Sequence, residues 1–404
     1  MAPPETAASP FRFAFPLLAV LTVLVSLFSR PAVQLYAFRN KDRVASLTRY
    51  ANNSSINSDH CAVNYDANAC EDVVVHFASS TAFIACGNPA ERVHWYPPAC
   101  AHNAAARSED SFQEDLFKYD IKKKRTTKLR IEGLSGDFIN HGVDVYGLPE
   151  DPTKVNIFAV NHGRGGDSIM IFSHVLGSDS VQLVRQARHP GIKTANGVAA
   201  VGPFGFFITN DHYFAGGILR KIEDFFGPWP WATDVQYCDA SGDATVCHRV
   251  SERHPGFNGI AVSKDKKTLF VGDSKIGVLT IFNITEDKSL IKANSIPLGG
   301  AADNIKLLPN NGDIIISIFP ILEDLPLYKA NVHSLGKDLL VPTAALRLRK
   351  KNGYTPELVY KGDGSGISYM TVAAIDPNNR VLIAGGVLQY GGFAVCNLDE
   401  KTLV

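Results

Sequence analysis

The tripeptide Asn-His-Gly occurs twice in this chain, at residues 140–142 and again at residues 161–163. The first copy, in INHGVDVY, has the composition of an exposed turn placed before an alternating apolar strand. A histidine, with an ordinary pKa of roughly 6.5, can take a proton from water near neutral pH. His141 and His162 are therefore candidates for general-base chemistry, although either one could instead cap a strand.

A second set of polar residues lies at the heads of short apolar strands. Four segments share this layout, with an asparagine near a turn and an apolar run after it: INHGVDVY, ANGVAAVG, FNGIAVSK and ADNIKLLP. Amide and carboxylate oxygens are the hard ligands that calcium prefers, and the ion takes about six to eight of them. The pattern is consistent with a shared calcium site, but Asn and Asp also favour turns for backbone reasons alone.

The elements that would bring these side chains together form a repeat. The four asparagines, at positions 140, 196, 258 and 304, are separated by 56, 62 and 46 residues, and each is followed by a further strand such as NIFAVNH or KTLFVGDS. A repeat of roughly 40–60 residues with several antiparallel strands is typical of a β-propeller. We predict an all-β fold, a six-bladed β-propeller with a central tunnel. A β-sandwich would explain the strand density but not the recurring asparagines.

In a propeller the innermost strand of each blade starts at the tunnel, so the heads of corresponding strands converge. The segment CEDVVVHF adds charge there, because Glu71 and Asp72 are adjacent at the start of a strand and neighbouring strand residues face opposite ways. One carboxylate could reach a central ion while the other faces a second site. The other oxygen donors expected to converge are Asn196, Asn258, Asp303 and Asn304.

Composition and the N-terminus limit the possible partners and location. The 404 residues carry 40 basic and 40 acidic side chains, so no net field would gather nucleic acid. Residues 13–28 form an uncharged apolar run flanked by arginines, which predicts an N-terminal hydrophobic helix within residues 1–30. We expect an uncleaved signal anchor in preference to a removed signal peptide or a buried helix. A stalk over residues 31–60 and the propeller over 61–404 would then lie in the secretory pathway, membrane-anchored or secreted.

Cysteine usage agrees with that compartment. The seven cysteines include no Cys-x-x-Cys pair, which favours disulfides over a zinc site. Cys238 and Cys247 suit a local bridge, and Cys61 with Cys396 would join the two ends of the folded region, so that the first strand completes the last blade. The pairing of the others stays open: Cys70, Cys86 and Cys100. Glycosylation sequons, meaningful only in the lumen, begin at Asn52, Asn53 and Asn283.

Five segments together resemble the paraoxonase/arylesterase family and follow the order of that family. They are VNHGRGGDSIMIF, ITNDHYF, FNGIAVSKD, ADNIKLLPNNGD and FAVCNL, and the resemblance runs from about Cys61 to Cys396. NDHYF is the most specific of them. The resemblance implies a six-bladed propeller with two calcium ions in its tunnel that hydrolyses lactones and aryl esters.

The resemblance also implies roles for individual residues. His141 and His162 match the histidine dyad of the family, and Thr371 matches a position that lines the substrate pocket. A second, structural calcium would bind Asp72 and the backbone carbonyl of Val143. The catalytic calcium would be held by the side chains of Glu71, Asn196, Asn258, Asp303 and Asn304.

Two departures from the family pattern change these expectations. Gly197 stands where the family has an aspartate, so the second calcium loses a principal ligand and its site is weaker, rebuilt or absent. The family's free cysteine near the pocket falls at about Ile318, so no thiol is available there. Two other functions stay open: a non-catalytic propeller that keeps calcium and binds a protein, and an enzyme resembling gluconolactonase or strictosidine synthase. NDHYF and the terminal cysteine pair argue against the second.

Overall fold

The computed structural model describes residues 46–52, 54–321 and 340–403. The predicted hydrophobic helix within residues 1–30 and the sequon at Asn53 lie outside the described residues. In the described part of the chain no helix is long and apolar enough to cross a membrane. From Leu47 onward the chain forms one compact unit.

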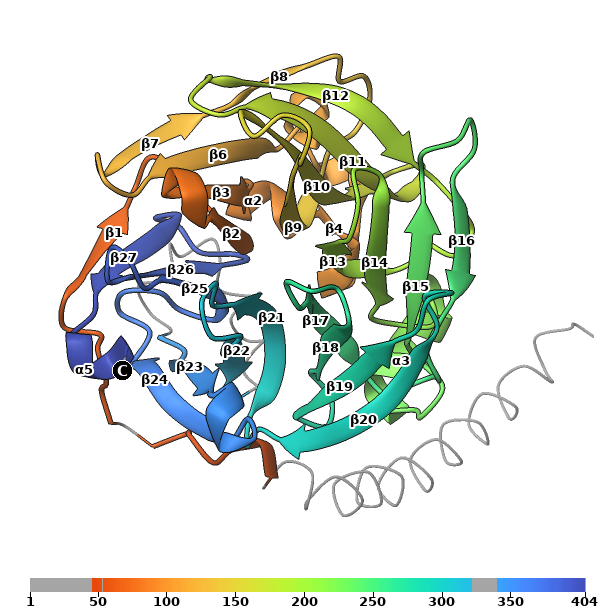
Figure 1. Ribbon diagram of the computed structural model, residues 1–404. Coiled ribbons are helices and arrows are strands. Elements are labelled where there is room, and N and C mark those ends of the chain that lie inside the picture. The colour runs from red at the N-terminus through yellow and green to blue at the C-terminus, as the bar shows by residue number, and fades with distance from the viewer. Residues whose placement is uncertain (1–45, 53, 322–339, 404) are drawn as a thin grey trace, which may run out of the picture. The chain divides into compact units, whose positions relative to one another are not determined.

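Six sheets, antiparallel except for one parallel outer strand, surround a central tunnel, and their innermost strands face one another across it (Figure 1). The predicted six-bladed β-propeller is confirmed. Three blades, from the tunnel outward, are β2 (Asp72–His76), β3 (Thr81–Cys86), β6 (Asp115–Asp120) and β7 (Arg125–Lys128); β9 (Asn140–Gly147), β10 (Lys154–Gly163), β11 (Gly166–Val175), β12 (Ser180–Ala187) and the parallel β8 (Arg130–Glu132); and β13 (Ala195–Ala200), β14 (Gly205–Asn210), β15 (Asp234–Asp239) and β16 (Val246–Arg249).

The remaining blades complete the ring, and the short elements lie in its connections. The blades are β17 (Phe257–Val262), β18 (Thr268–Asp273), β19 (Val278–Ile284) and β20 (Leu290–Pro297); β21 (Ala301–Leu307), β22 (Ile314–Phe319), β23 (Thr343–Leu348) and β24 (Pro356–Gly362); and β25 (Met370–Asp376), β26 (Val381–Gly386), β27 (Phe393–Asn397) and β1 (Cys61–Asn64). The short elements are α2 (Pro89–Arg92), α3 (Gly217–Phe226), α5 (Glu400–Leu403) and the pair β4 (Trp95–Tyr96) and β5 (Ala101–His102).

The first strand closes the ring, as predicted. Strand β1 pairs antiparallel with β27, Cys61 lies opposite Cys396, and the two form a disulfide. The predicted bridge between Cys238 and Cys247 joins β15 to β16.

A third disulfide, between Cys70 and Cys86, could not be assigned from the sequence. Cys100 is the cysteine without a disulfide in the described chain. Part of the segment expected as a stalk packs on the propeller: Leu47 is 1% exposed, and Ile56 forms a β-bridge with Lys361.

Apolar side chains fill the spaces between neighbouring blades, because a single four-stranded blade cannot bury both of its faces. In one such cluster Phe158 of β10 and Phe206 of β14 stack at a tilt, with their ring centroids 5.7 Å apart. These inter-blade cores hold the inner strands at a constant spacing around the tunnel.

The inner strands are irregular at one common level. The pairing register shifts between Ala195 and Val198 in β13, between Phe257 and Ile260 in β17, and between Ala302 and Ile305 in β21. Such bulges bend a strand and redirect its side chains. The recurring asparagines therefore lie inside strands at bulges, and the prediction that they occupy turns was wrong, since Asn-Gly also suits a bulge.

Two glycines allow the bulged strands to approach closely. A Cβ atom on Gly142 would lie 2.4 Å from the carbonyl oxygen of Asn196, and one on Gly259 would lie 2.3 Å from that of Asp303. Any side-chain carbon at either position would push neighbouring inner strands apart. The glycine of each motif thus serves packing, while the residue before it faces the tunnel.

Candidate functional site

Five oxygen-bearing residues converge at the end of the tunnel where the inner strands begin. Glu71 directly precedes β2, and the others lie at the bulges of β13, β17 and β21. Four of the five are buried, and Asn258 is half-buried. They are the residues expected from the sequence: Glu71, Asn196, Asn258, Asp303 and Asn304.

Three of their oxygen atoms are buried without a hydrogen-bond partner among the described residues. These are Glu71 Oε2, Asn196 Oδ1 and Asn258 Oδ1. A buried acceptor left unpaired costs about 1–3 kcal/mol, so a cluster of three indicates a missing electrophilic partner. The amide of Asn196 is oriented by Asp211, whose Oδ2 accepts a 3.1 Å hydrogen bond from Nδ2 and leaves Oδ1 unpaired.

The charge of the cluster also favours a cation. Burial, followed by repulsion from Glu71, Asp72 and Asp211, raises the pKa of Asp303 well above its ordinary range. The His, Cys, Asp and Glu side chains of the described chain form no group of three able to hold a metal by themselves. The site instead mixes carboxylates with asparagine amides, which is the hard-oxygen donor set of calcium. These residues therefore fit a calcium ion.

A chain of close polar contacts runs from this cluster through both candidate histidines. His141 Nε2 lies 3.3 Å from Glu71 Oε1, and His141 Nδ1 lies 2.9 Å from His162 Nε2. His162 Nδ1 is in turn 2.9 Å from Asp167 Oδ1. His141 is 4% exposed and His162 is 1% exposed, within β9 and β10, so the prediction of an exposed turn was wrong.

Asp167 sets the orientation of protons along this chain. A carboxylate only accepts hydrogen bonds, so neutral His162 donates from Nδ1 and keeps its lone pair on Nε2. His141 then donates from Nδ1, and its Nε2 faces Glu71 Oε1 with a lone pair when the ring is neutral and with an N–H that the carboxylate accepts when the ring is protonated. Burial lowers the pKa of His141, but attraction and hydrogen bonding by Glu71 outweigh it, and the net effect raises that pKa.

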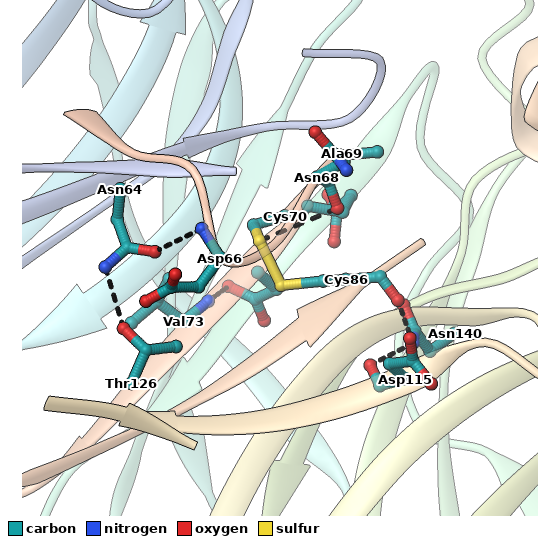
Figure 2. The surroundings of a disulfide bond; sticks show 12 residues. Asn64, Asp66, Asn68, Ala69, Cys70, Val73, Cys86, Asp115, Thr126 and Asn140 are labelled. Atoms are coloured by element: carbon teal, nitrogen blue, oxygen red, sulfur yellow. Dashed lines mark hydrogen bonds between the residues drawn. A yellow bond between two sulfur atoms is a disulfide. The ribbon is translucent and has the colours of Figure 1, made fainter. Parts of the chain in front are cut away.

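A buried ionic network holds His141 in place through its neighbour Asn140. Arg92 donates to both oxygens of Glu114 and, at 2.9 Å, to Asn140 Oδ1, while Glu114 accepts from the Asn140 amide N–H. Figure 2 shows the Cys70–Cys86 disulfide beside this point, where Asn140 Nδ2 donates at 2.8 Å to the carbonyls of Cys86 and Asp115. The disulfide, the ion pair and strand β9 therefore fix the backbone that carries His141.

Two cavities lie near the inner strands, one beside the start of β13 and the other at the far ends of the inner strands. A cavity of about 160 Å³ is lined by His162 and Asp167, among others, and lies beside the hydrogen-bonded chain. The larger cavity, of about 890 Å³, opens at the other ends of the strands, and Asp144 and Lys306 belong to its lining while neither dyad histidine does. The smaller cavity is therefore the one that borders the chain of His141, His162 and Asp167, through its last two members.

The remaining predicted residues lie as follows. Asp72 Oδ2 accepts from the Val143 amide N–H at 2.8 Å, and both residues contact Lys306. Burial raises the pKa of Asp72 to about 6, and Lys306 opposes that rise. Thr371 is buried and donates at 2.7 Å to the Glu71 carbonyl, and Ile318 is fully buried in β22.

Sequence reasoning missed several residues that the geometry brings into the site. Asp167 and Lys306 carry charge there, and Asp211 orients Asn196. His212 of the NDHYF motif hydrogen-bonds Asp211 at 2.6 Å, and so holds the carboxylate that orients Asn196. A signal for Asp167 existed: residues 164–165 make a two-residue hairpin loop, which places Asp167 opposite His162.

Comparison with known proteins identifies the family. A family profile described as Arylesterase matches residues 107–397, most of the propeller. The chain belongs to the arylesterase family. The resemblance seen in the sequence motifs is thereby confirmed, and the chain is an ester hydrolase by family.

Individual arylesterase relatives are moderately similar. Serum paraoxonase/arylesterase 2 of Rattus norvegicus is 28% identical over 278 residues, covering 68% of this chain and 74% of the relative. Serum paraoxonase/lactonase 3 of Mus musculus is 26% identical over 374 residues, covering 91% and 96%. Among solved structures, a gluconolactonase from Xanthomonas campestris superposes with a TM-score of 0.49 at 12% identity, covering 85% of this chain and 92% of that one.

Proposed function

We propose that this protein is a calcium-dependent hydrolase of lactones and aryl esters. The observation that carries the proposal is the meeting of two features at one end of the tunnel. Three buried oxygens on Glu71, Asn196 and Asn258 lack a partner among the described residues, and the Nε2 atom of His141 lies 3.3 Å from the other carboxylate oxygen of Glu71. Family membership and the names of the paraoxonase relatives support an ester or lactone as substrate.

Calcium would be held by Glu71, Asn196, Asn258, Asp303 and Asn304. When bound, it supplies a Lewis acid for the carbonyl oxygen of an ester. Asn196 is oriented for this role by Asp211, and Asn304 contacts Glu71 Oε1 at 2.8 Å.

His141 would act as the general base. Its Nε2 takes a proton from the attacking water, the water oxygen bonds to the acyl carbon, and the bond from that carbon to the leaving oxygen breaks. The same proton can then return to the leaving oxygen, so that a lactone becomes a hydroxy acid. His162 and Asp167 are positioning residues, since they hold the tautomer of His141 and stabilise its protonated form.

The proposed location is the secretory pathway, with the protein held by its N-terminal hydrophobic segment or secreted. Three disulfides suit an oxidising compartment. Asn52 and Asn283, two of the proposed glycosylation sites, are exposed.

Lactone hydrolysis by the full chain, with calcium and after chelation, tests the proposal. We expect activity that disappears on chelation and returns when calcium is restored. Asp303→Ala should lose bound calcium and activity together. Folded protein that binds calcium but hydrolyses neither γ- or δ-lactones nor phenyl acetate would refute the enzymatic function and favour a binding propeller.

A further inference from the structure

Lys306 reaches into the tunnel below the oxygen cluster. It lies in β21, two residues after Asn304 and one residue after the bulge that ends at Ile305. Its Nζ is 2.8 Å from Asp72 Oδ1, 2.9 Å from Asp72 Oδ2 and 3.3 Å from the carbonyl oxygen of Val143. The lysine side chain is 16% exposed and the aspartate side chain 3%.

These contacts coincide with the ligands that a second calcium would need. Asp72 and the Val143 carbonyl are the groups that the family resemblance assigns to that ion, and the ammonium contacts all of their free oxygens. The distances are those of charged N–H···O bonds and exceed the roughly 2.3–2.6 Å of a calcium–oxygen bond. A divalent ion on the same oxygens would lie against the ammonium, so the residues present do not fit a second calcium.

Asp72 has little bonding capacity left for a metal. Its Oδ1 also accepts from the Val73 amide N–H at 2.9 Å, and its Oδ2 accepts from the Val143 amide N–H at 2.8 Å. With the ammonium, each oxygen has two hydrogen-bond donors, which matches its two lone pairs.

The neighbouring residues Gly197 and Asp144 offer no further ligand for a second calcium. Gly197 supplies no carboxylate, and a Cβ atom there would lie 2.9 Å from Ile260 Cγ2. The next carboxylate along the tunnel, Asp144, uses its two oxygens on the backbone N–H groups of Val145 and Ala200, at 2.8 Å each. Asp144 therefore has no oxygen directed at the position between Asp72 and Val143, and the ammonium of Lys306 is the cationic group that contacts Asp72 there.

We propose that the ammonium of Lys306 occupies the second cation position, so that this propeller binds one calcium ion per chain. The lysine joins β2, β9 and β21 through Asp72 and Val143, as a structural metal would. The inference rests on the proposed function only for the identity of the first ion.

Calcium content and thermal unfolding of the full chain test this. The chain is depleted of metal, refilled with calcium, desalted, and its calcium counted by elemental mass spectrometry. Unfolding is followed in chelator for the wild type, Lys306→Gln, and the double variant Asp72→Asn/Lys306→Gln. Lys118→Gln is the matched control, because Lys118 is a buried lysine whose carboxylate partner is Asp179 and not Asp72.

We expect one calcium per wild-type chain. Lys306→Gln should lower the unfolding midpoint by on the order of 5 °C, since it leaves the Asp72 carboxylate buried without a charge partner. Replacing Asp72 by asparagine as well removes the unpaired charge and should recover part of that loss, even if the single variant fails to fold. The rest of the loss should persist, because the amide NH₂ group must face the backbone N–H of Val73 or of Val143. Asp72→Asn should not rescue Lys118→Gln.

Two calcium ions in the wild type would overturn the inference whatever the variants do. So would a Lys306→Gln midpoint equal to that of the wild type, or a double variant no more stable than the single one. Wild-type protein without any calcium would instead refute the proposed catalytic ion. In that case the loss and rescue in the Lys306 variants would still support the lysine as the bond between blades.

Discussion

Replacing Asp167 by asparagine should disable the base without disturbing the fold. The two side chains have the same shape, but the carboxylate of Asp167 accepts two hydrogen bonds, from His162 Nδ1 at 2.9 Å and from the Ala195 amide N–H at 2.8 Å. An asparagine has one acceptor oxygen for these two positions. One of the two contacts must therefore face an NH₂ group.

The structure indicates which contact changes. The Ala195 N–H can only donate, so placing the NH₂ group against it leaves a buried donor unpaired, at a cost of about 1–3 kcal/mol. Histidine can adapt by shifting its proton to the other nitrogen. The arrangement with oxygen at Ala195 and NH₂ at His162 is thus favoured roughly 5- to 150-fold. This orientation of the amide reverses the tautomers of His162 and His141. His141 Nε2 then carries a hydrogen and cannot accept a proton from water.

We expect kcat for a lactone to fall by a similar factor, about 10- to 100-fold, which reaches only the lower end of the range of about 10²–10⁴ for complete loss of a general base. KM, calcium content and the unfolding midpoint should stay unchanged. Asp137→Asn is the control, because Asp137 lies at the same rim and pairs with Arg164 at 2.7 Å. An unchanged kcat in Asp167→Asn, or a loss that follows calcium content, would refute the tautomer argument.

Three further predictions concern the base, the closure of the ring and a buried histidine. His141→Gln should lower kcat by about 10²–10⁴-fold with calcium content unchanged, and undiminished turnover would remove the dyad assignment. Serine at Cys61 and Cys396, which are 335 residues apart, should lower the free energy of unfolding in urea by about 2–5 kcal/mol, and equal stability would show that hydrogen bonding alone closes the ring. Burial lowers the pKa of His174, so the unfolded chain binds this proton first as pH falls below about 6.5, and stability is lost from there downward. His174→Gln should reduce that loss between about pH 7 and 5, whereas the exposed His248→Gln should not.

The repeat made much of this site predictable. Asn196, Asn258 and Asn304 recur at blade spacing, and closure of the ring by Cys61 and Cys396 follows from a propeller with two ends to join. Their local conformation was harder to predict, because Asn-Gly has the same composition in a turn and in a bulge. The approach of Gly142 to the Asn196 carbonyl distinguishes the bulge from the turn, and that contact joins residues of different blades.

The residues that could not be assigned from the sequence are those whose hydrogen-bond partners lie on other strands. Asp167 follows from the hairpin register, which the two-residue loop determines. Arg92 could not be assigned, since its contacts with Ala69, Val387 and Asn140 come from three distant segments. Lys306 follows Asn304 by two residues, but its role depends on Asp72, which is more than two hundred residues away in the sequence.

With Gly197 and Lys306 in place, we expect calcium to serve the reaction and not to join the blades. An ion at Glu71 and Asp303 would serve the reaction, whereas the joint between β2, β9 and β21 is made by a covalently tethered charge that chelation cannot remove. Removing calcium should therefore abolish hydrolysis while the inner strands keep their ammonium bridge. Inactivation by chelators should then be fully reversible at moderate temperature, because the blades that position His141 stay assembled. Unfolding on chelation at that temperature would mean that the oxygen cluster itself holds the ring together.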